Sequence, residues 1–310
     1  YVEPTPLGTV GGVKALQSEL DQPFLVLYGD VLMDMDLSRL LAFHKVKGAD
    51  ATLVVHPNDH PYDSDLLDVD SHDKVTAFYA KPHPEGLQYR NLVNAAAYVF
   101  NPIVLDYLEA GVKADFGKDI FPSLHKELDL YAYNTPEYLK DMGTPDRLYK
   151  VEEALQSGKV AARNLNQLQK CVFLDRDGVI NIDTDLIHRP KDFQLYPYAA
   201  ESIKKLNKMG FLVVVVTNQS VIARGLCTIK ELGDIHKKME TELGADGAFV
   251  EAIYFCPHHP HGGFEGEIQE YKVKCECRKP SPGMLLQAQK RYNIDMDQSF
   301  LVGDSPRDIE

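Results

Sequence analysis

Short runs of apolar residues alternate along the chain with segments that repeat apolar positions at the helical period. The apolar runs comprise residues 24–28, 51–55, 171–174, 211–216, 252–255 and 300–302. Unbroken apolar runs of this length are typical of fully buried strands. Helix-like stretches such as residues 37–45 and 199–208 lie between them. The alternation predicts an α/β fold in which parallel sheets are covered by helices on both faces.

This pattern is interrupted in the middle of the chain. A short helix-like piece stops at Gly158, and the polar tract that follows lacks the spacing of a core element. Such interruptions are typical of domain boundaries. We therefore predict a first domain over residues 1–158, a linker over 159–169 and a second domain over 170–310.

Charge and composition narrow the class of protein. The chain has 33 Lys and Arg against 46 Asp and Glu, a formal net charge of −13. It therefore lacks the excess of cations that sequence-blind nucleic-acid binding requires. The sequence contains neither a long apolar segment nor a signal-peptide pattern. We expect a cytoplasmic globular protein without nucleic-acid or membrane partners.

Polar side chains follow the predicted strands of the second half. Asp175 and Asp177 come directly after residues 171–174, and ligands of open α/β folds bind at this edge of the sheet. One carboxylate can attack a phosphoryl group and a second can protonate the leaving oxygen, while a divalent cation offsets the negative charge. Further phosphate-binding or cation-binding groups follow later in the chain: Thr217, Asn218, Gln219, Ser220, Arg278, Lys279 and Asp304. These residues predict a phosphoryl-transfer site.

The same residues, in the same order, resemble the four motifs of the haloacid dehalogenase superfamily of phosphatases. The resemblance implies that Asp175 is the nucleophile and Asp177 the acid and base. It implies that Thr217 and Lys279 stabilise the phosphoryl group. It also implies Mg²⁺ bound by Asp175, the backbone carbonyl of Asp177, and Asp304.

Within that superfamily, residues 175–181, 217–220, 222–225 and 275–280 are most similar to the D-glycero-D-manno-heptose 1,7-bisphosphate phosphatases. The likeness implies a sugar bisphosphate substrate. Arg278 is the residue we expect to recognise the sugar phosphate, with further contacts from Asp183, Asn218, Gln219 and Ser220. Two departures, at Val221 and over residues 185–188, lie where the family touches its sugar. A histidinol-phosphate phosphatase, with the same motifs, is the alternative.

Three of the five cysteines lie close together in the sequence. Cys256, Cys275 and Cys277 with His258 form a Cys₃His set that can close a tetrahedral structural Zn²⁺ site. His259 or His261 could replace His258 as the fourth ligand. The loop between these cysteines is rich in Gly and acidic residues, and we expect it to be mobile without metal.

The first half resembles the sugar-1-phosphate nucleotidyltransferases. The likeness rests on residues 3–12, 81–82, 94–100 and 141–145 and on the carboxylate of Asp30 at a strand end. It implies Mg²⁺ bound by Asp30 and Asp141, a nucleotide near Gly8 and Gly11, and a sugar phosphate near Lys81 and Asn94. A guanosine nucleotide is the expected nucleoside triphosphate.

The sequence departs from that family at two places. Ala96 stands where the family has Gly, and the Gly-rich triphosphate loop that opens the family's fold is absent. We therefore expect an internal piece of a longer two-domain protein, truncated at both ends and lacking nucleotidyl transfer as given. The fold class expected is two Rossmann-like α/β domains, the second with a zinc-bearing loop.

Together the two likenesses imply a bifunctional enzyme of nucleotide-activated heptose synthesis. The alternative from another class is a phosphatase attached to a catalytically empty sugar-nucleotide-binding module.

Overall fold

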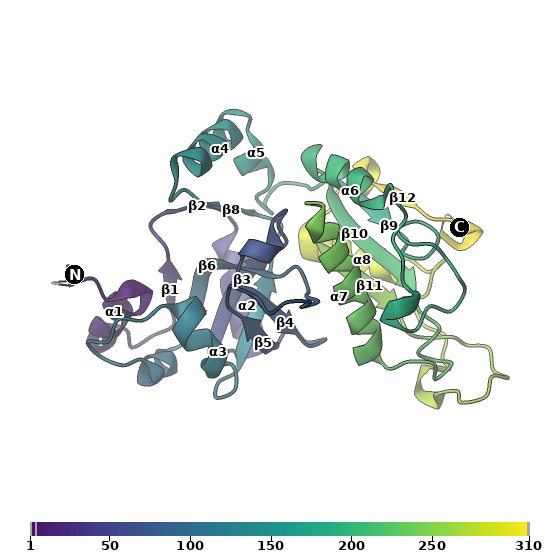
Figure 1. Cartoon of the computed structure of the whole chain (residues 1–310), viewed down its shortest axis with the longest axis horizontal. Helices are drawn as coiled ribbons and strands as arrows, with labels where there is room; N and C mark the ends of the chain where they lie inside the picture. The colour runs from purple at the N-terminus through teal and green to yellow at the C-terminus, as the bar shows by residue number, and fades with distance from the viewer. Residues whose placement is uncertain (1, 4, 309–310) are drawn as a thin grey trace. The chain divides into compact units, whose positions relative to one another are not determined.

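The computed structural model describes residues 2–3 and 5–308, which form two compact units. The first unit comprises the chain up to His56 with Pro61–Leu87 and Leu92–Asn164. The second comprises Pro57–His60, Gln88–Asn91 and the chain from Leu165 onward. Each unit has its own β-sheet with helices around it (Figure 1). Two short segments of the first half are therefore part of the second unit.

The first unit is built on a six-stranded sheet and a separate two-stranded ribbon. Its strands are β1 (Phe24–Leu27), β2 (Val31–Asp34), β3 (Ala51–His56), β4 (Leu66–Val69), β5 (Val75–Tyr79), β6 (Val93–Phe100), β7 (Leu130–Asn134) and β8 (Tyr138–Asp141). Its α-helices are α1 (Gly8–Ala15), α2 (Leu37–Lys47), α3 (Phe121–Leu124), α4 (Pro145–Gln156) and α5 (Lys159–Ala162). The large sheet has the order β5-β4-β6-β3-β7, with β1 also paired to β6, and the ribbon is β2-β8.

The prediction of parallel sheets is wrong for the first unit. Strand β6 runs antiparallel to β1, β3 and β4, and β4 runs antiparallel to β5. Among the strand pairs described in this sheet, β3–β7 is the parallel one. The sequence pattern failed because a buried apolar run carries no information on strand direction, which depends on how the connections cross the sheet.

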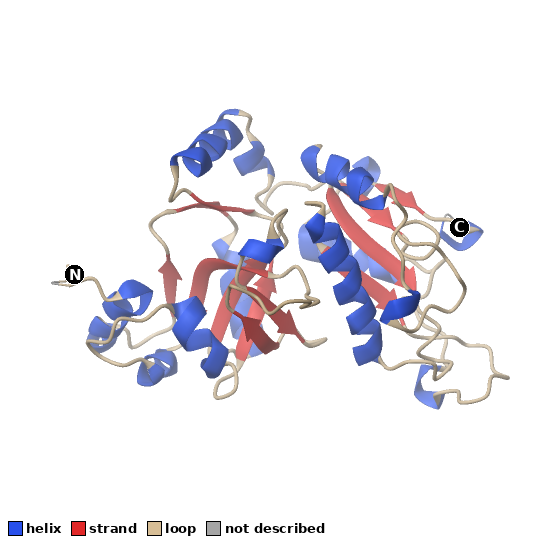
Figure 2. Ribbon diagram, in the orientation of Figure 1, coloured by secondary structure: helices blue, strands red, loops and turns tan. Residues whose placement is uncertain are grey.

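The second unit contains a sheet whose paired strands are all parallel, as predicted. Its order is β11-β10-β9-β12, formed by β9 (Cys171–Leu174), β10 (Leu212–Asn218), β11 (Ala252–Cys256) and β12 (Phe300–Val302). Its α-helices are α6 (Ala199–Lys208), α7 (Ile229–Ala245) and α8 (Gly283–Tyr292). Figure 2 shows the strands of this sheet beside the helices that pack on it.

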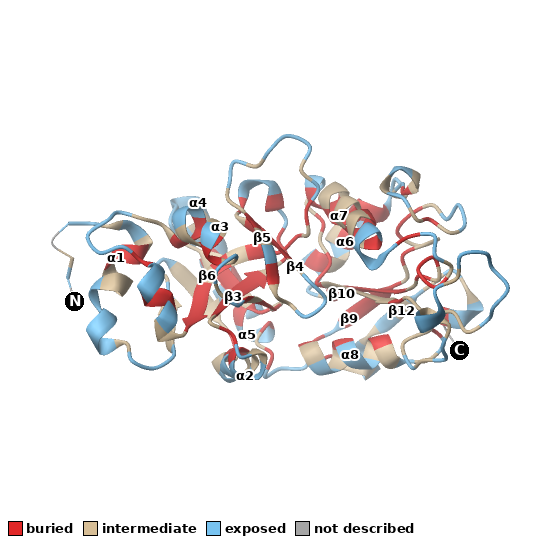
Figure 3. Cartoon of the chain, turned by 90° about the horizontal axis from the view of Figure 1, so that it is seen from below, coloured by how far each residue is buried: buried red, intermediate tan, exposed pale blue. Residues whose placement is uncertain are grey.

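The two faces of this sheet have different helical cover. Alternate side chains of a strand point to opposite faces. Val213 and Val215 accordingly join one apolar cluster with residues of α6 and α7, whereas Val214 and Val216 join another with residues of α8. The central strands β9 and β10 are buried up to Asn218, the last residue of β10, which is partly buried (Figure 3). The sheet is therefore the middle layer of an α/β/α sandwich.

Three of the strands are less buried than predicted. Leu27 of β1 is 45% exposed, Phe300 of β12 is 61% exposed, and residues 252–255 of β11 are only partly buried. β11 and β12 stand at the two edges of their sheet, and among the described strands β1 pairs with β6. Strands with one neighbour have side chains that no second strand covers.

Helix α7 begins at a capping box. The Thr228 hydroxyl accepts from the backbone N–H of Glu231, and the Glu231 carboxylate accepts from the backbone N–H of Thr228. Across the described part of the chain, the helices are too short or too polar to cross a membrane.

Candidate active site and metal centre

The predicted catalytic residues of the second unit meet at the carboxyl edge of the parallel sheet. Asp175 follows β9, and its backbone N–H donates to the carbonyl of Val302 on β12, 2.9 Å away. Thr217 lies at the end of the neighbouring strand β10. Asp304 follows β12 by two residues. Parallel strands end at the same edge, so this topology brings together residues that are far apart in the sequence.

Lys279 is the cation at the centre of the group. Its Nζ lies 2.8 Å from Oδ2 of Asp175 and 2.6 Å from Oδ1 of Asp308, and the residue is buried. The side-chain amide of Asn218 accepts from the backbone N–H of Lys279 at 3.0 Å and donates to its carbonyl at 3.1 Å. Asn218, predicted to touch substrate, thus holds the backbone of Lys279 in place.

Burial and charge act on Asp175 in opposite directions. Burial raises the pKa of the Asp175 carboxyl, and the neighbouring Lys279 ammonium group opposes that rise. The Arg176 backbone N–H donates to Oδ1 of Asp175 at 2.7 Å, which also favours the ionised form. An ionised, partly desolvated carboxylate is what a nucleophile for phosphorus requires.

Asp177 is held by a network of side chains. Arg176 donates from Nε to Oδ1 at 3.0 Å and from Nη2 to Oδ2 at 2.9 Å. Asn181 Nδ2 donates to Oδ1 at 3.0 Å, and Gln219 Nε2 donates to Oδ2 at 2.8 Å. Gln219 Nε2 also donates to the Thr217 hydroxyl at 2.9 Å, which connects two of the predicted catalytic residues.

Three carboxylates can share a cation at this edge. One oxygen each of Asp175, Asp304 and Asp308 lies within 4.8 Å of the others. Carboxylate oxygens in such a group suit Mg²⁺. Asp308 is not among the Mg²⁺ ligands predicted from the sequence. Its position four residues after Asp304, beyond the end of a strand, could have indicated a second carboxylate at the cation site.

The backbone conformation and the space at position 178 suit only glycine. Its φ is +77°, and a Cβ built there would lie 2.1 Å from Oδ2 of Asp304. A side chain would therefore strain the backbone and push Asp304 out of the group.

The remaining predicted substrate-binding residues are only partly connected to this site. Asp183 is exposed, and its Oδ1 accepts from the backbone N–H of Asp185 at 2.9 Å. Ser220 accepts, through its carbonyl, from the Arg224 N–H at 3.0 Å. Arg278 Nη1 donates to the carbonyl of His258 at 3.0 Å, which places its guanidinium beside the cysteine cluster.

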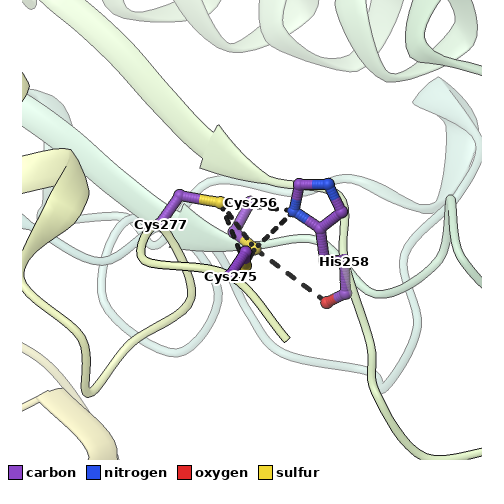
Figure 4. Close-up of side chains that lie close together, drawn as sticks. All are labelled: Cys256, His258, Cys275 and Cys277. Atoms are coloured by element: carbon purple, nitrogen blue, oxygen red, sulfur yellow. Dashed lines mark hydrogen bonds between the residues drawn. The ribbon is translucent and has the colours of Figure 1, made fainter. Parts of the chain in front are cut away.

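Cys256, His258, Cys275 and Cys277 form a closed group (Figure 4). Cys277 Sγ lies 3.2 Å from the sulfurs of Cys256 and Cys275, and His258 Nδ1 lies 3.3 Å from Cys277 Sγ. A Cys₃His group of this kind fits a structural Zn²⁺ ion. Of the three histidines considered from the sequence, the one in this group is His258.

The loop that joins the two halves of the cluster has contacts of its own. The Arg224 guanidinium lies 4.0 Å from the centre of the Phe264 ring. Lys272 Nζ lies 2.9 Å from Oε1 of Glu267. These contacts stabilise a loop that has few apolar side chains.

In the first unit, the two predicted Mg²⁺ ligands lie at one end of the β2–β8 ribbon, Asp30 just before β2 and Asp141 as the last residue of β8. Val31, next to Asp30, pairs with Asp141, and the backbone N–H of Met142 donates to the Asp30 carbonyl at 2.7 Å. Both carboxylates flank Gly143: a Cβ there would lie 3.0 Å from Oδ1 of Asp141 and 3.7 Å from Oδ2 of Asp30. Asp141 also forms an ion pair with Arg147.

The backbones of the two predicted sugar-phosphate residues both bond to Asp65, a residue for which the sequence predicted no role. Oδ1 of Asp65 accepts from the backbone N–H of Lys81, and its carbonyl accepts from that of Asn94, each at 3.0 Å. Gly8, at the start of α1, forms a bridge with Ala114. Gly11 lies one turn further along α1 and is buried.

Two family models match the chain, and the matched residues overlap in the middle. The nucleotidyl transferase family model matches residues 1–158, and the haloacid dehalogenase-like hydrolase model matches residues 123–310. The chain belongs to both families, one in each half.

The second half is 43% identical, over 146 residues, to a D-glycero-β-D-manno-heptose-1,7-bisphosphate 7-phosphatase of Yersinia pestis. The match covers 47% of this chain and 76% of the relative, which places this half in the same family. The protein is thus an enzyme, a phosphatase that carries a nucleotidyltransferase domain.

Two solved structures are also similar. One is a D,D-heptose 1,7-bisphosphate phosphatase from B. bronchiseptica complexed with magnesium and phosphate: 40% identity, TM-score 0.40, covering 45% of this chain and 73% of that one. The other is HddC from Yersinia pseudotuberculosis complexed with GMP-PN: 22% identity, TM-score 0.42, covering 50% of this chain and 65% of that one. The family assignment rests on the sequence matches alone.

Proposed function

We propose that the second half hydrolyses D-glycero-D-manno-heptose 1,7-bisphosphate to heptose 1-phosphate and inorganic phosphate. The observation that carries the proposal is the group of Asp175, Lys279, Asp304 and Asp308 at one edge of the sheet. The choice of sugar rests on the 43% identity to a phosphatase of that name.

In this mechanism, Asp177 carries a proton when the substrate binds. Asp175 attacks the phosphorus of the 7-phosphate, and Asp177 gives its proton to the departing sugar oxygen. An aspartyl phosphate on Asp175 results. Asp177, now ionised, takes a proton from water, and that water displaces phosphate and restores Asp175. Lys279 and the Thr217 hydroxyl offset the charge of the transferring group.

Two metals belong to the proposal. Asp175, Asp304 and the backbone carbonyl of Asp177 would hold Mg²⁺, with Asp308 close by. The bound cation would neutralise charge on the phosphoryl oxygens. Cys256, His258, Cys275 and Cys277 would hold Zn²⁺, with a structural role because the four protein ligands leave no open position.

For a first half that includes the Gly-rich triphosphate loop, we propose transfer of a nucleotidyl group, from GTP, to heptose 1-phosphate. Asp30 and Asp141 would hold Mg²⁺ between nucleotide and sugar phosphate, with Gly8 and Gly11 near the nucleotide and Lys81 and Asn94 near the sugar phosphate. The two activities would then act on consecutive intermediates of nucleotide-activated heptose synthesis. We place the division between the halves at residues 159–169.

The phosphatase proposal is tested by phosphate release from D-glycero-D-manno-heptose 1,7-bisphosphate with Mg²⁺. We expect release by the wild-type chain and loss of release in Asp175→Asn. Histidinol phosphate is the competing substrate. If a folded chain with one zinc bound hydrolyses histidinol phosphate and leaves the heptose substrate intact, the sugar assignment is wrong.

A further inference from the structure

Arg176 is a charged side chain with no exposed surface, and it lies between two proposed catalytic carboxylates in the sequence. Its side chain is 0% exposed. A buried cation of this kind is stable only when ion pairs and hydrogen bonds replace its water. Nη2 of Arg176 donates to Asp177 at 2.9 Å and also to Oε1 of Gln219 at 3.0 Å, and Nε donates to Asp177 at 3.0 Å.

A buried histidine completes the surroundings of Arg176. His236 of α7 lies with Nε2 3.4 Å from Nη1 of Arg176. Arginine has donors only, so His236 accepts through an unprotonated Nε2. Burial, with the positive charges of Arg176 and Arg90, holds the pKa of His236 well below its usual range. The histidine is therefore neutral and accepts from Nη1, whereas Asp177 accepts from Nε and Nη2.

The carboxylate of Asp177 has all its acceptor positions occupied in this arrangement. Oδ1 accepts from Arg176 and Asn181, and Oδ2 accepts from Arg176 and Gln219. A carboxylate has about four lone-pair positions, so these four donors fix both the rotation and the tilt of the group. Arg176 supplies two of the four donors from one planar guanidinium group. The ammonium group of a lysine cannot reproduce this geometry.

We propose that Arg176 is the positioning residue for Asp177: it sets the direction in which the acid–base carboxylate faces the reacting phosphate. The inference rests on the proposed function, because it assumes that Asp177 transfers the protons. To act as the acid, Asp177 takes up a proton in place of one of its four accepted hydrogen bonds and donates that proton to the leaving oxygen. The remaining bonds to Arg176 keep the carboxyl group aligned. Arg176 itself neither touches substrate nor exchanges a proton.

The test uses the full chain and the variants Arg176→Lys, Asp177→Asn and their double variant. Arg291→Lys, a half-buried arginine of α8 outside this network, is the matched control. Loss of alignment should lower kcat for the heptose bisphosphate about 10²-fold, the usual scale of acid–base catalysis. KM should change little, since Arg176 does not reach the substrate. In the Asp177→Asn background the same substitution should have no further effect, because Arg176 acts only through that carboxylate.

A second readout separates positioning from general damage. The leaving group of p-nitrophenyl phosphate departs without protonation, so Arg176→Lys should release a rapid burst of about one p-nitrophenolate per chain before slow turnover. The sugar substrate, which needs the acid, should show no burst. If Arg176→Lys does not fold, His236→Gln tests the same point by loosening Nη1. We expect a defect of about threefold to tenfold that also vanishes in Asp177→Asn, as coupling energies of contacting residues imply.

Additive losses in the double variant, or equal losses with both substrates and no burst, would overturn the inference. Full activity in folded Arg176→Lys would also overturn the inference. Failure of the proposed function has a different signature: Asp175→Asn would keep its activity, or Asp177→Asn would match the wild type.

Discussion

The ammonium group of Lys279 lies 2.8 Å from a carboxylate oxygen of Asp175. The same ammonium is 2.6 Å from Asp308, so one buried cation separates two carboxylates that would otherwise repel each other. Lys279 thus stabilises the arrangement of these two carboxylates before any substrate binds.

Replacing Lys279 by Met should abolish most phosphatase activity while leaving a folded chain. The cation is lost from beside the transferring phosphoryl group, and effects of this kind are about 10²- to 10³-fold in kcat. Phosphate release measures the activity of the variant, and circular dichroism shows whether it is folded. Lys290→Met, at an exposed position of α8, should behave as wild type. Near-normal kcat in Lys279→Met would contradict the role given to Lys279.

Gly178→Ala should weaken Mg²⁺ binding. A Cβ at this position would lie 2.1 Å from Asp304, and φ is +77°. Gly210→Ala is the matched control, because φ there is +84° and no atom lies within 4 Å of the new Cβ. Both variants should lose about 1 kcal/mol of unfolding free energy from backbone strain. Gly178→Ala alone should need more Mg²⁺ for half-maximal activity, and the same Mg²⁺ requirement in both would show that Asp304 has room to move.

Cys277→Ser should lose bound zinc and destabilise the second unit. A structural zinc site contributes several kcal/mol to folding, which corresponds to a fall of roughly 10 °C in Tm. Metal analysis should find one zinc per wild-type chain and almost none in the variant. Cys227→Ala, a buried cysteine outside the cluster, should keep its zinc. Zinc retained by Cys277→Ser at full occupancy would refute the ligand set.

The neutral His236 predicts a specific acid sensitivity. Its pKa is held well below the ordinary value of 6.5 by burial and by the charges of Arg176 and Arg90. Below pH 6.5 the unfolded chain therefore binds a proton that the folded chain does not. The free energy of unfolding falls as the pH drops, by up to about 1.4 kcal/mol per pH unit for this one group.

His236→Gln should remove the part of the pH dependence of the unfolding free energy that is due to His236. Denaturant unfolding of the wild type and the variant at pH 7.5 and 5.5 should show the wild type losing more stability on acidification. His261→Gln, at an exposed position, should leave the wild-type slope unchanged. Equal slopes in wild type and His236→Gln would mean that His236 is protonated in the folded chain.

Much of the second unit could be predicted from the sequence because its chemistry follows buried strands. The runs before Asp175, Thr217 and Asp304 are central or neighbouring parallel strands, so the residues after them meet at one edge. The cysteine cluster was predictable for a different reason: its four residues are types with a strong preference for metal, and they lie within 22 positions of one another in the chain.

Other features were not encoded in such patterns. Strand β6 reverses direction relative to its neighbours, and an apolar run does not reveal this. No sequence pattern predicted the burial of Arg176, because its partners Gln219 and His236 come from other parts of the chain. Asp308 owes its place to Lys279, almost thirty residues earlier in the chain.

The strand order β11-β10-β9-β12 has a consequence for synthesis on the ribosome. β9 precedes its edge partner β12 and the carboxylates of Asp304 and Asp308 by more than 120 residues in the chain. The nascent chain therefore carries Asp175, the proposed nucleophile, over more than 120 residues of synthesis before the residues that complete the proposed cation site are made. These carboxylates reach Asp175 when β12 pairs with β9.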